Sequence, residues 1–165
     1  KPKKIEEHRK DPRLTKGPII VSIDTSGSMS GQPQRIAFSL LKQLLRMAKK
    51  QKRPCYLISF SVRSKSIDLA KPRNWSKIDN FLEHSYSGGT DGEQMLAEAI
   101  HVLQKGTYEM ADVLIVSDFE FPVPNPSTME KIDKEKTLGT RFYGLKIGHY
   151  GVKGYKHIMD KIWEV

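Results

Sequence analysis

Apolar residues in this chain alternate between short continuous runs and stripes at helical spacing. The runs at 18–24, 55–60 and 111–117 lack a helical period and contain many β-branched residues, which predicts strands buried on both faces. A further strand is predicted at 141–147. Apolar residues spaced three and four apart over 33–50 predict a long amphipathic helix between the first two strands.

The remaining segments predict shorter elements. The stretch 66–70 follows the second strand too closely for a crossover helix, so we expect an antiparallel edge strand there. Asn74 can cap a short helix that runs to about His84. From Gly154 onward the pattern fits either a short helix or a strand.

Two capping-box spacings predict further helix starts. Thr90 and Glu93 precede a helix with one apolar face, and Ser127 and Glu130 precede a polar helix that stops near Gly139. The alternation of strands and helices predicts an α/β fold. We expect a doubly wound, mostly parallel sheet with an antiparallel edge strand and helices on both faces.

The length fits one domain with one core, which we place at 17–165 behind a basic tail at 1–16. The formal net charge of +9 is concentrated in that tail and in the block 42–53, which contains six basic residues and no acidic one. Such a block marks either the solvated C-terminal end of a helix or a nucleic-acid contact. No aromatic residues interleave with it, which favours the helix end.

Location and redox state are indicated by a few features. No apolar run approaches the ~18 residues that a membrane span needs, so we expect a soluble protein without a span. Cys55 is the single cysteine and lies in an apolar run, which predicts a small core residue and weakly favours the cytoplasm. The chain begins without Met, so we expect a fragment of a longer protein.

Oxygen-bearing side chains follow the strands at the edge where such sheets bind ligands. They are Asp24, Ser26 and Ser28 after the first strand, Thr90 before a helix, and Asp118 after the strand at 111–117. Two carboxylates and three hydroxyls, without His or Cys nearby in sequence, suit a hard cation. We expect Mg²⁺, with Mn²⁺ as the alternative, and water completing the coordination.

This arrangement resembles the von Willebrand factor A domain and its metal-ion-dependent adhesion site, which has the pattern Asp-x-Ser-x-Ser, then Thr, then Asp. The resemblance covers about Gly17 to the C-terminus. It implies that Ser26 and Ser28 ligate the metal directly, and that Thr90 does so directly or through water. It implies that Asp24 and Asp118 act mainly through water, and that an Asp or Glu of a binding partner fills the remaining position.

A partner that supplies a carboxylate also needs a surface to dock on. We expect an exposed apolar rim formed by Met29, Phe119 and Phe121 around the ion, because apolar side chains anchor interfaces. Glu120 is interpreted as a solvated loop carboxylate that can reach toward the partner. Tyr150, in the loop at 149–154, is expected at the same sheet end.

Four stretches are also similar to the C-terminal domain of ViaA-type proteins. They are Gly-Pro-Ile-Ile-Val at 17–21, Gly-Gly-Thr-Asp at 88–91, Val-Ser-Asp-Phe at 116–119 and Ile-Trp at 162–163. This resemblance implies a cytoplasmic bacterial or archaeal protein with a separate, largely helical N-terminal region. It also implies a MoxR-type AAA+ ATPase as partner.

An enzyme is the rival interpretation. Asp24, Asp91, Asp118 and Glu120 could hold metal for a phosphohydrolase or nuclease. The sequence has no phosphate-binding Gly-rich loop with Lys and no nucleophile elbow, and hydroxyls occupy the middle of the acidic set. We therefore expect no enzymatic activity, and we expect Asp91 to cap a helix or support a ligand rather than bind metal.

Overall fold

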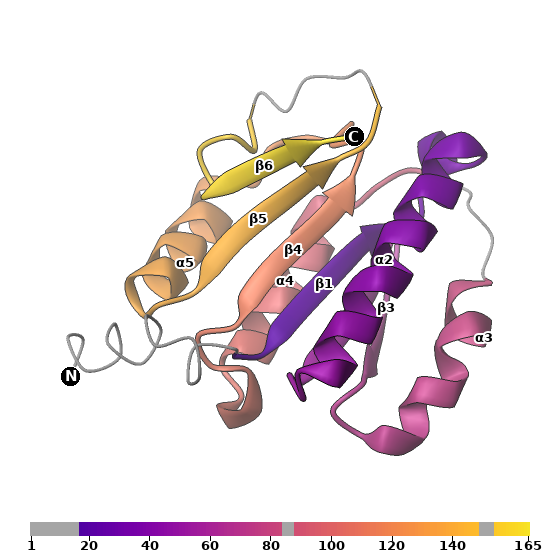
Figure 1. Ribbon diagram of the computed structural model, residues 1–165. Helices are drawn as coiled ribbons and strands as arrows, with labels where there is room; N and C mark the ends of the chain where they lie inside the picture. The colour runs from indigo at the N-terminus through magenta and orange to yellow at the C-terminus, as the bar shows by residue number, and fades with distance from the viewer. Residues whose placement is uncertain (1–16, 84–87, 149–153) are drawn as a thin grey trace.

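The computed structural model describes residues 17–83, 88–148 and 154–165. In these ranges six strands form one sheet in the order β3-β2-β1-β4-β5-β6 (Figure 1). Their bounds are β1 Ile19–Asp24, β2 Cys55–Phe60, β3 Ser64–Asp68, β4 Asp112–Ser117, β5 Arg141–Lys146 and β6 Lys161–Glu164. β3 pairs antiparallel with β2, and the other neighbours pair parallel. The predicted fold class is confirmed.

Helices cover both faces of this sheet. Figure 1 shows α2 (Gln32–Lys50) in front of the sheet with α3 (Ile78–Leu82) beside it, whereas α4 (Gly92–Leu103) and α5 (Pro126–Thr137) lie behind. Short 3₁₀ helices are η1 (Gly27–Met29), η2 (Pro72–Lys77) and η3 (Gly106–Tyr108). No helix in the described ranges is long and apolar enough to cross a bilayer.

The central strand β1 explains why the apolar runs are continuous. Ile20 belongs to the core under α4 and α5, whereas Ile19 and Val21 belong to the core under α2 and α3. Because successive side chains of a strand point to opposite faces, a strand between two helical layers buries every position. All six residues of β1 and of β2 are buried accordingly.

Three predicted elements differ from the structure in detail. The edge strand β3 begins two residues earlier than expected, at Ser64, because its polar, partly exposed side chains give no apolar signal. The helix expected over 74–84 consists of η2 followed by α3, and His84 lies outside the described residues. The C-terminal segment, for which the sequence allowed a helix or a strand, contains β6, which is parallel to β5.

Both predicted capping boxes are wrong, although the helices are present. The side chain of Asp91, not Thr90, accepts the N–H of Gln94 at 3.0 Å and caps α4. Likewise α5 is capped by Asn125, not Ser127, which lies inside the helix. Asp91 is a stronger capping residue than Thr90, whereas Asn125 and Ser127 are similar in capping strength and the path of the loop selects Asn125. The cap at Asp91 leaves the Thr90 hydroxyl available for another role.

Candidate metal centre

The candidate site lies at the carboxyl edge of the sheet, where the chain leaves two neighbouring parallel strands. Asp24 is the last residue of β1, and Asp118 follows the last residue of β4. These strands are adjacent, and their following helices, α2 and α5, lie on opposite faces. This is the switch point at which sheets of this kind bind ligands.

Asp24 is fully buried, and both of its carboxylate oxygens are held. Oδ1 accepts the backbone N–H of Ser26 at 2.9 Å, and Oδ2 accepts the hydroxyl of Ser117 at 2.5 Å. Burial raises the pKa of Asp24 above its ordinary value, the hydrogen bonds from Ser117 and Ser26 oppose that rise, and the nearby Asp118 carboxylate adds to it. Negative charge at this position is therefore costly unless a positive group is close.

The hydroxyls of Ser26 and Ser28 converge in the turn after β1. Their Oγ atoms are 3.2 Å apart, and η1 keeps the turn closed through the Met29 N–H bonded to the Ser26 carbonyl at 3.0 Å. Neighbouring ligands of an octahedral ion at ~2.1 Å are separated by about 3 Å. The two hydroxyl oxygens thus have the spacing that a Mg²⁺-sized ion requires of adjacent ligands.

The loop that contains Thr90 is bonded on one side to this turn and on the other to the residue that follows β2. The N–H of Gly27 donates to the carbonyl of Gly88 at 3.1 Å, and the N–H of Asp91 donates to the carbonyl of Ser61 at 2.6 Å. Thr90 lies between these two bonds and is half-buried. The structure therefore brings Thr90 to the same edge as the turn after β1, beside the N-terminus of α4.

The loop after β4 is organised by Ser117, which the sequence interpretation did not assign to the site. Its hydroxyl donates to Asp24 and accepts the N–H of Phe119 at 2.8 Å, so it couples β1 to the start of the loop. Asp118 accepts the N–H of Glu120 at 3.0 Å. The sequence feature that could have assigned Ser117 to the site is its position at the end of an apolar strand, directly before the carboxylate of Asp118.

Phe119 has an unusual backbone conformation at this position. Its φ of +57° lies in the left-handed region, which costs a bulky residue about 1 kcal/mol or more. The buried Phe119 ring, 4% exposed, compensates by packing against Tyr155 with ring centroids 5.6 Å apart. This turn lets the chain reverse immediately after Asp118, so the carboxylate stays at the sheet edge.

The two buried carboxylates of the edge are not neutralised by a basic side chain of the described residues. Asp24 and Asp118 are both nearly inaccessible to solvent, and across the described part of the chain no Lys, Arg or His nitrogen lies within 4.0 Å of either carboxylate. The same ranges contain no group of three or more His, Cys, Asp and Glu side chains that could hold a metal. A cation at this edge would therefore be held by hydroxyls and carboxylates together, which suits a hard ion.

Solved structures with the same architecture come from several proteins. The chain superposes on the VWA domain of SpRpn10 with a TM-score of 0.65 and 12% identity, covering 90% of this chain and 87% of that one. The von Willebrand factor type A protein from Catenulispora acidiphila gives a TM-score of 0.66 and 14% identity over 90% and 38%. The chain has the von Willebrand factor A fold. A mussel-byssus protein of this fold, proximal thread matrix protein 1, has zinc in its MIDAS motif, with a TM-score of 0.59 and 12% identity over 90% and 41%.

Curated relatives are similar in sequence as well. Regulatory protein ViaA from Edwardsiella ictaluri (strain 93-146) is 30% identical over 159 residues, which is 94% of this chain and 32% of that protein. Regulatory protein ViaA from Proteus mirabilis (strain HI4320) is 30% identical over 157 residues, with the same coverage. The chain spans about a third of the length of these relatives. No protein-family model matches the sequence.

The apolar rim expected around the ion of this von Willebrand factor A fold is wrong for two of its three members. Met29 is fully buried in the core under α2, and Phe119 is buried in the core under α4. Phe121 is half-buried and packs edge-on against Tyr155, with ring centroids 4.8 Å apart. Large apolar loop residues next to a sheet edge fold back over the core, because that removes more apolar area from water.

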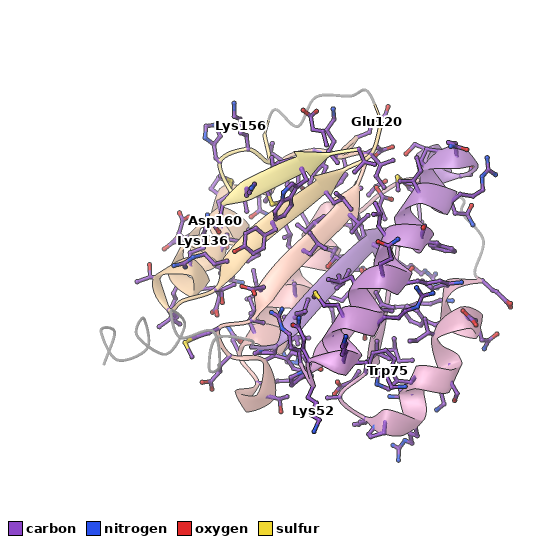
Figure 2. The ribbon with its side chains drawn as sticks, in the orientation of Figure 1. Lys52, Trp75, Glu120, Lys136, Lys156 and Asp160 are labelled. Carbon is purple, nitrogen blue, oxygen red and sulfur yellow. The ribbon has the colours of Figure 1, made fainter. Side chains whose placement is uncertain are left out.

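Of the two polar residues expected on the docking surface, the structure describes Glu120 but not Tyr150. Glu120 is exposed, and Figure 2 shows it at the upper edge of the sheet. A solvated Glu120 agrees with the sequence interpretation. Tyr150 lies outside the described residues, as does the tail at 1–16.

The basic block at 42–53 covers the second half of α2 and the residues that follow it, and its last residues lie at the opposite end of the molecule. Figure 2 places Lys52 at the bottom, beyond the C-terminal end of α2. Lys49 lies over the Trp75 ring, 5.2 Å from its centroid, and Arg53 bonds the carboxylate of Asp112 at 3.0 Å. Part of this block therefore stabilises the fold and is separate from the candidate metal centre.

Proposed function

We propose that this chain is a metal-dependent protein-interaction domain without enzymatic activity. Ser26, Ser28 and Thr90 would hold Mg²⁺, or alternatively Mn²⁺, while Asp24 and Asp118 act mainly through water. The observation that carries this proposal is the pair of hydroxyl oxygens 3.2 Å apart beside two buried carboxylates that have no cationic partner among the described residues. The zinc-bound MIDAS of the mussel-byssus protein supports the choice of a divalent ion.

The donor set explains why a partner's acid would bind here. Neutral hydroxyls leave a bound cation electron-poor, and the positive N-terminal end of α2, which begins at Gln32, faces the same edge. When bound, the ion would supply a Lewis-acidic position for one external carboxylate. Metal and partner then strengthen each other's binding, because each stabilises the state that the other prefers.

The identity of the partner is proposed from the resemblance to ViaA-type proteins. Both curated relatives are named regulatory proteins, which supports a regulatory or interaction role for this domain. We propose a MoxR-type AAA+ ATPase as the protein that supplies an Asp or Glu to the metal, and the cytoplasm as the place of this interaction. Exposed Glu120 lies at the same edge and would form part of the contact surface.

The arrangement of the acidic residues argues against a hydrolase. Asp91 is engaged as the cap of α4, with its Oδ1 on the N–H of Gln94, and Glu120 is exposed to solvent. In the part of the chain that the structure describes, Asp24 and Asp118 remain as the buried carboxylates at the edge. Two-metal phosphoryl chemistry uses more negative charge than this pair provides.

Thermal unfolding in EDTA, Mg²⁺, Mn²⁺ and Ca²⁺ tests the metal centre. A cation that binds only the folded state raises the midpoint, and at 100 times its Kd the stabilisation is about 2.7 kcal/mol. We expect Mg²⁺ or Mn²⁺ to raise the midpoint of the wild type but not of Ser26→Ala. Ser39→Ala is the matched control, because Ser39 is exposed on α2.

A pull-down of a purified MoxR-type ATPase, with Mg²⁺ or EDTA, then tests the partner. We expect capture by the wild type and Ser39→Ala only when the metal is present, and no capture by Ser26→Ala. Equal capture in EDTA, or full capture by a folded Ser26→Ala variant, would contradict the metal-mediated contact.

A further inference from the structure

A hollow of about 320 Å³ lies between the second half of α2 and the segment formed by η2 and α3. It is lined by residues within 42–49 and 75–79, all of which the structure describes. Figure 2 shows Trp75, one of these residues, beside the lower part of α2. We call this hollow the Trp75 hollow. None of the proposed metal ligands lines it.

The floor of the Trp75 hollow is apolar and firmly held. Leu45 belongs to the core under α2, and Ile78 and Trp75 are half-buried against that core. The indole N–H of Trp75 donates to the carbonyl of Leu69 at 2.9 Å, so η2 is bonded to the residue that follows β3. The hollow is therefore formed before a ligand binds, which lowers the entropic cost of binding.

The rim of the hollow is basic. Lys42, Arg46 and Lys49 line it from α2 at spacings of four and three, and all three are exposed. The Lys49 ammonium lies over the Trp75 ring, and Lys42 is 3.9 Å from the carboxylate of Asp79. Arg46 lies between them and forms no ion pair with another described residue. Its planar guanidinium can hold a carboxylate through two parallel hydrogen bonds.

The surroundings of the hollow are also basic. η2 adds Arg73 and Lys77, both exposed, to the cations of α2. Asp79 is the one acidic residue among those that line the hollow, and Lys42 is already close to it. The tail at 1–16 contains seven basic and three acidic residues, so its net charge does not match this surface. The charge pattern therefore favours a negatively charged ligand.

The combination of an apolar floor and a basic rim favours an acidic peptide over a nucleic acid. Single-stranded nucleic acids stack their bases on free aromatic faces. Lys49 already lies over the ring of Trp75, 5.2 Å from its centroid, and no other aromatic residue lines the hollow. An aliphatic side chain of a peptide would instead pack on Leu45 and Ile78, while neighbouring carboxylates meet the rim.

The length of the rim matches a short extended segment. Lys42 and Lys49 are seven positions apart on α2, which corresponds to about 10 Å along the helix axis. Alternate residues of an extended chain point to the same side and are about 7 Å apart. An acid, an apolar residue and a second acid at alternate positions therefore extend over about 13 Å. Such a segment places its apolar side chain on the floor and its acids beside the cations.

We infer that the Trp75 hollow binds an acidic segment of a partner protein, in which an apolar residue lies between two carboxylates at alternate positions. Arg46 is the central contact for these carboxylates, with Lys42 and Lys49 on either side. This contact needs no metal ion and lies outside the proposed metal centre, so the two can be tested separately. It also gives the basic block at 42–53 a role in recognition.

Peptides of about ten residues test this inference on the full 165-residue chain, in EDTA and about 0.1 M salt. The acidic peptide carries Glu, Leu and Glu at alternate central positions. One twin carries Lys in place of each Glu, and the other carries Ser in place of Leu. NMR signals of the indole N–H groups report on binding, because Trp75 lines the hollow and Trp163 lies on β6. We expect the acidic peptide to shift the Trp75 signal alone, and each twin to bind at least tenfold more weakly.

A charge reversal tests the role of Arg46. Arg46→Glu should weaken the acidic peptide at least tenfold and strengthen binding of the Lys twin. Arg35→Glu is the matched control, because it changes the charge equally at an exposed position of the same helix outside the hollow. Arg35 is 11 positions from Arg46, about 16 Å along α2, which exceeds the screening length of about 10 Å. A cooperative thermal transition in EDTA checks that both variants fold.

Several results would overturn the inference. They are equal binding of the acidic peptide and its Lys twin, no binding of the acidic peptide, and binding that survives Arg46→Glu in a folded protein. A Trp75 shift caused by a short oligothymidine, but not by the acidic peptide, would assign the hollow to nucleic acid. A Trp75 shift that grows with protein concentration in the absence of peptide would assign it to a second copy of the chain.

Discussion

At the residue scale, the negative charge of Asp24 is needed for the proposed metal site but lowers the stability of the fold. Its pKa is raised in the folded protein, mainly by burial, so the folded state holds this proton more tightly than the unfolded state. Stability from this group is therefore present at acidic pH and is lost as pH rises through the folded pKa. Wherever the side chain is ionised and no metal is present, its charge destabilises the fold.

The substitution Asp24→Asn tests these two effects of the charge. Asn keeps an oxygen for the Ser26 N–H, and its amide can donate to the Ser117 oxygen, so the contact with Ser117 is kept with its direction reversed. We expect an unfolding midpoint in EDTA at about pH 7 equal to or above that of the wild type, and no response to Mg²⁺. A midpoint several degrees lower would show that the charge itself supports the fold.

The thiol of Cys55 provides an independent test of the core. Cys55 is fully buried on β2, and burial raises its pKa to about 12. At pH 8 only about one thiol in 10⁴ is then ionised, and the thiolate is the reactive form. We expect negligible reaction with a disulfide reagent in the native protein and complete reaction in guanidinium chloride. A native rate equal to that of free cysteine would contradict the buried position.

At the scale of elements, the strands were easier to predict than the ends of the helices. The run at 55–60 is short and almost continuously apolar, which favours a strand buried on both faces over a helix. Helix starts are ambiguous, because Thr90 and Asp91 both suit a cap, and so do Asn125 and Ser127. Only the three-dimensional path of the loop selects between them.

The choice between two possible caps at the start of α5 can be measured. The side chain of Asn125 accepts the N–H of Thr128 at 2.9 Å, whereas Ser127 lies inside the first turn. We expect Asn125→Ala to lower the free energy of unfolding by about 1 kcal/mol, and Ser127→Ala to change it by less than about 0.5 kcal/mol. Urea denaturation of both variants measures the two values. A larger loss from Ser127→Ala would support the sequence-based cap instead.

At the scale of the whole molecule, the candidate site depends on strand order, which the sequence does not state. Asp24 and Asp118 are more than 90 residues apart in sequence and meet only because β4 pairs with β1. The spacing of Asp, Ser and Thr, together with the family resemblance, predicted this gathering. The roles of Ser117 and of the buried Phe119 depend on side-chain packing, which hydropathy alone does not reveal.

The separation of charge across the molecule gives a last prediction. α2 contains 19 residues and is about 28 Å long, so its basic C-terminal end is farther from the candidate metal centre than the screening length of about 10 Å in 0.1 M salt. Lys50→Glu and Arg35→Glu change the net charge equally, but Arg35 lies in the first turns of α2.

Titration of the unfolding midpoint with Mg²⁺ compares these two variants. Arg35→Glu should lower the concentration that gives half of the stabilisation, because it removes positive charge near the ion, whereas Lys50→Glu should leave it unchanged. An equal shift in both variants would mean that net charge, rather than local charge, controls the site. The basic block would then have to act on the metal over the full length of α2, and its separation from the carboxyl edge would have no functional meaning.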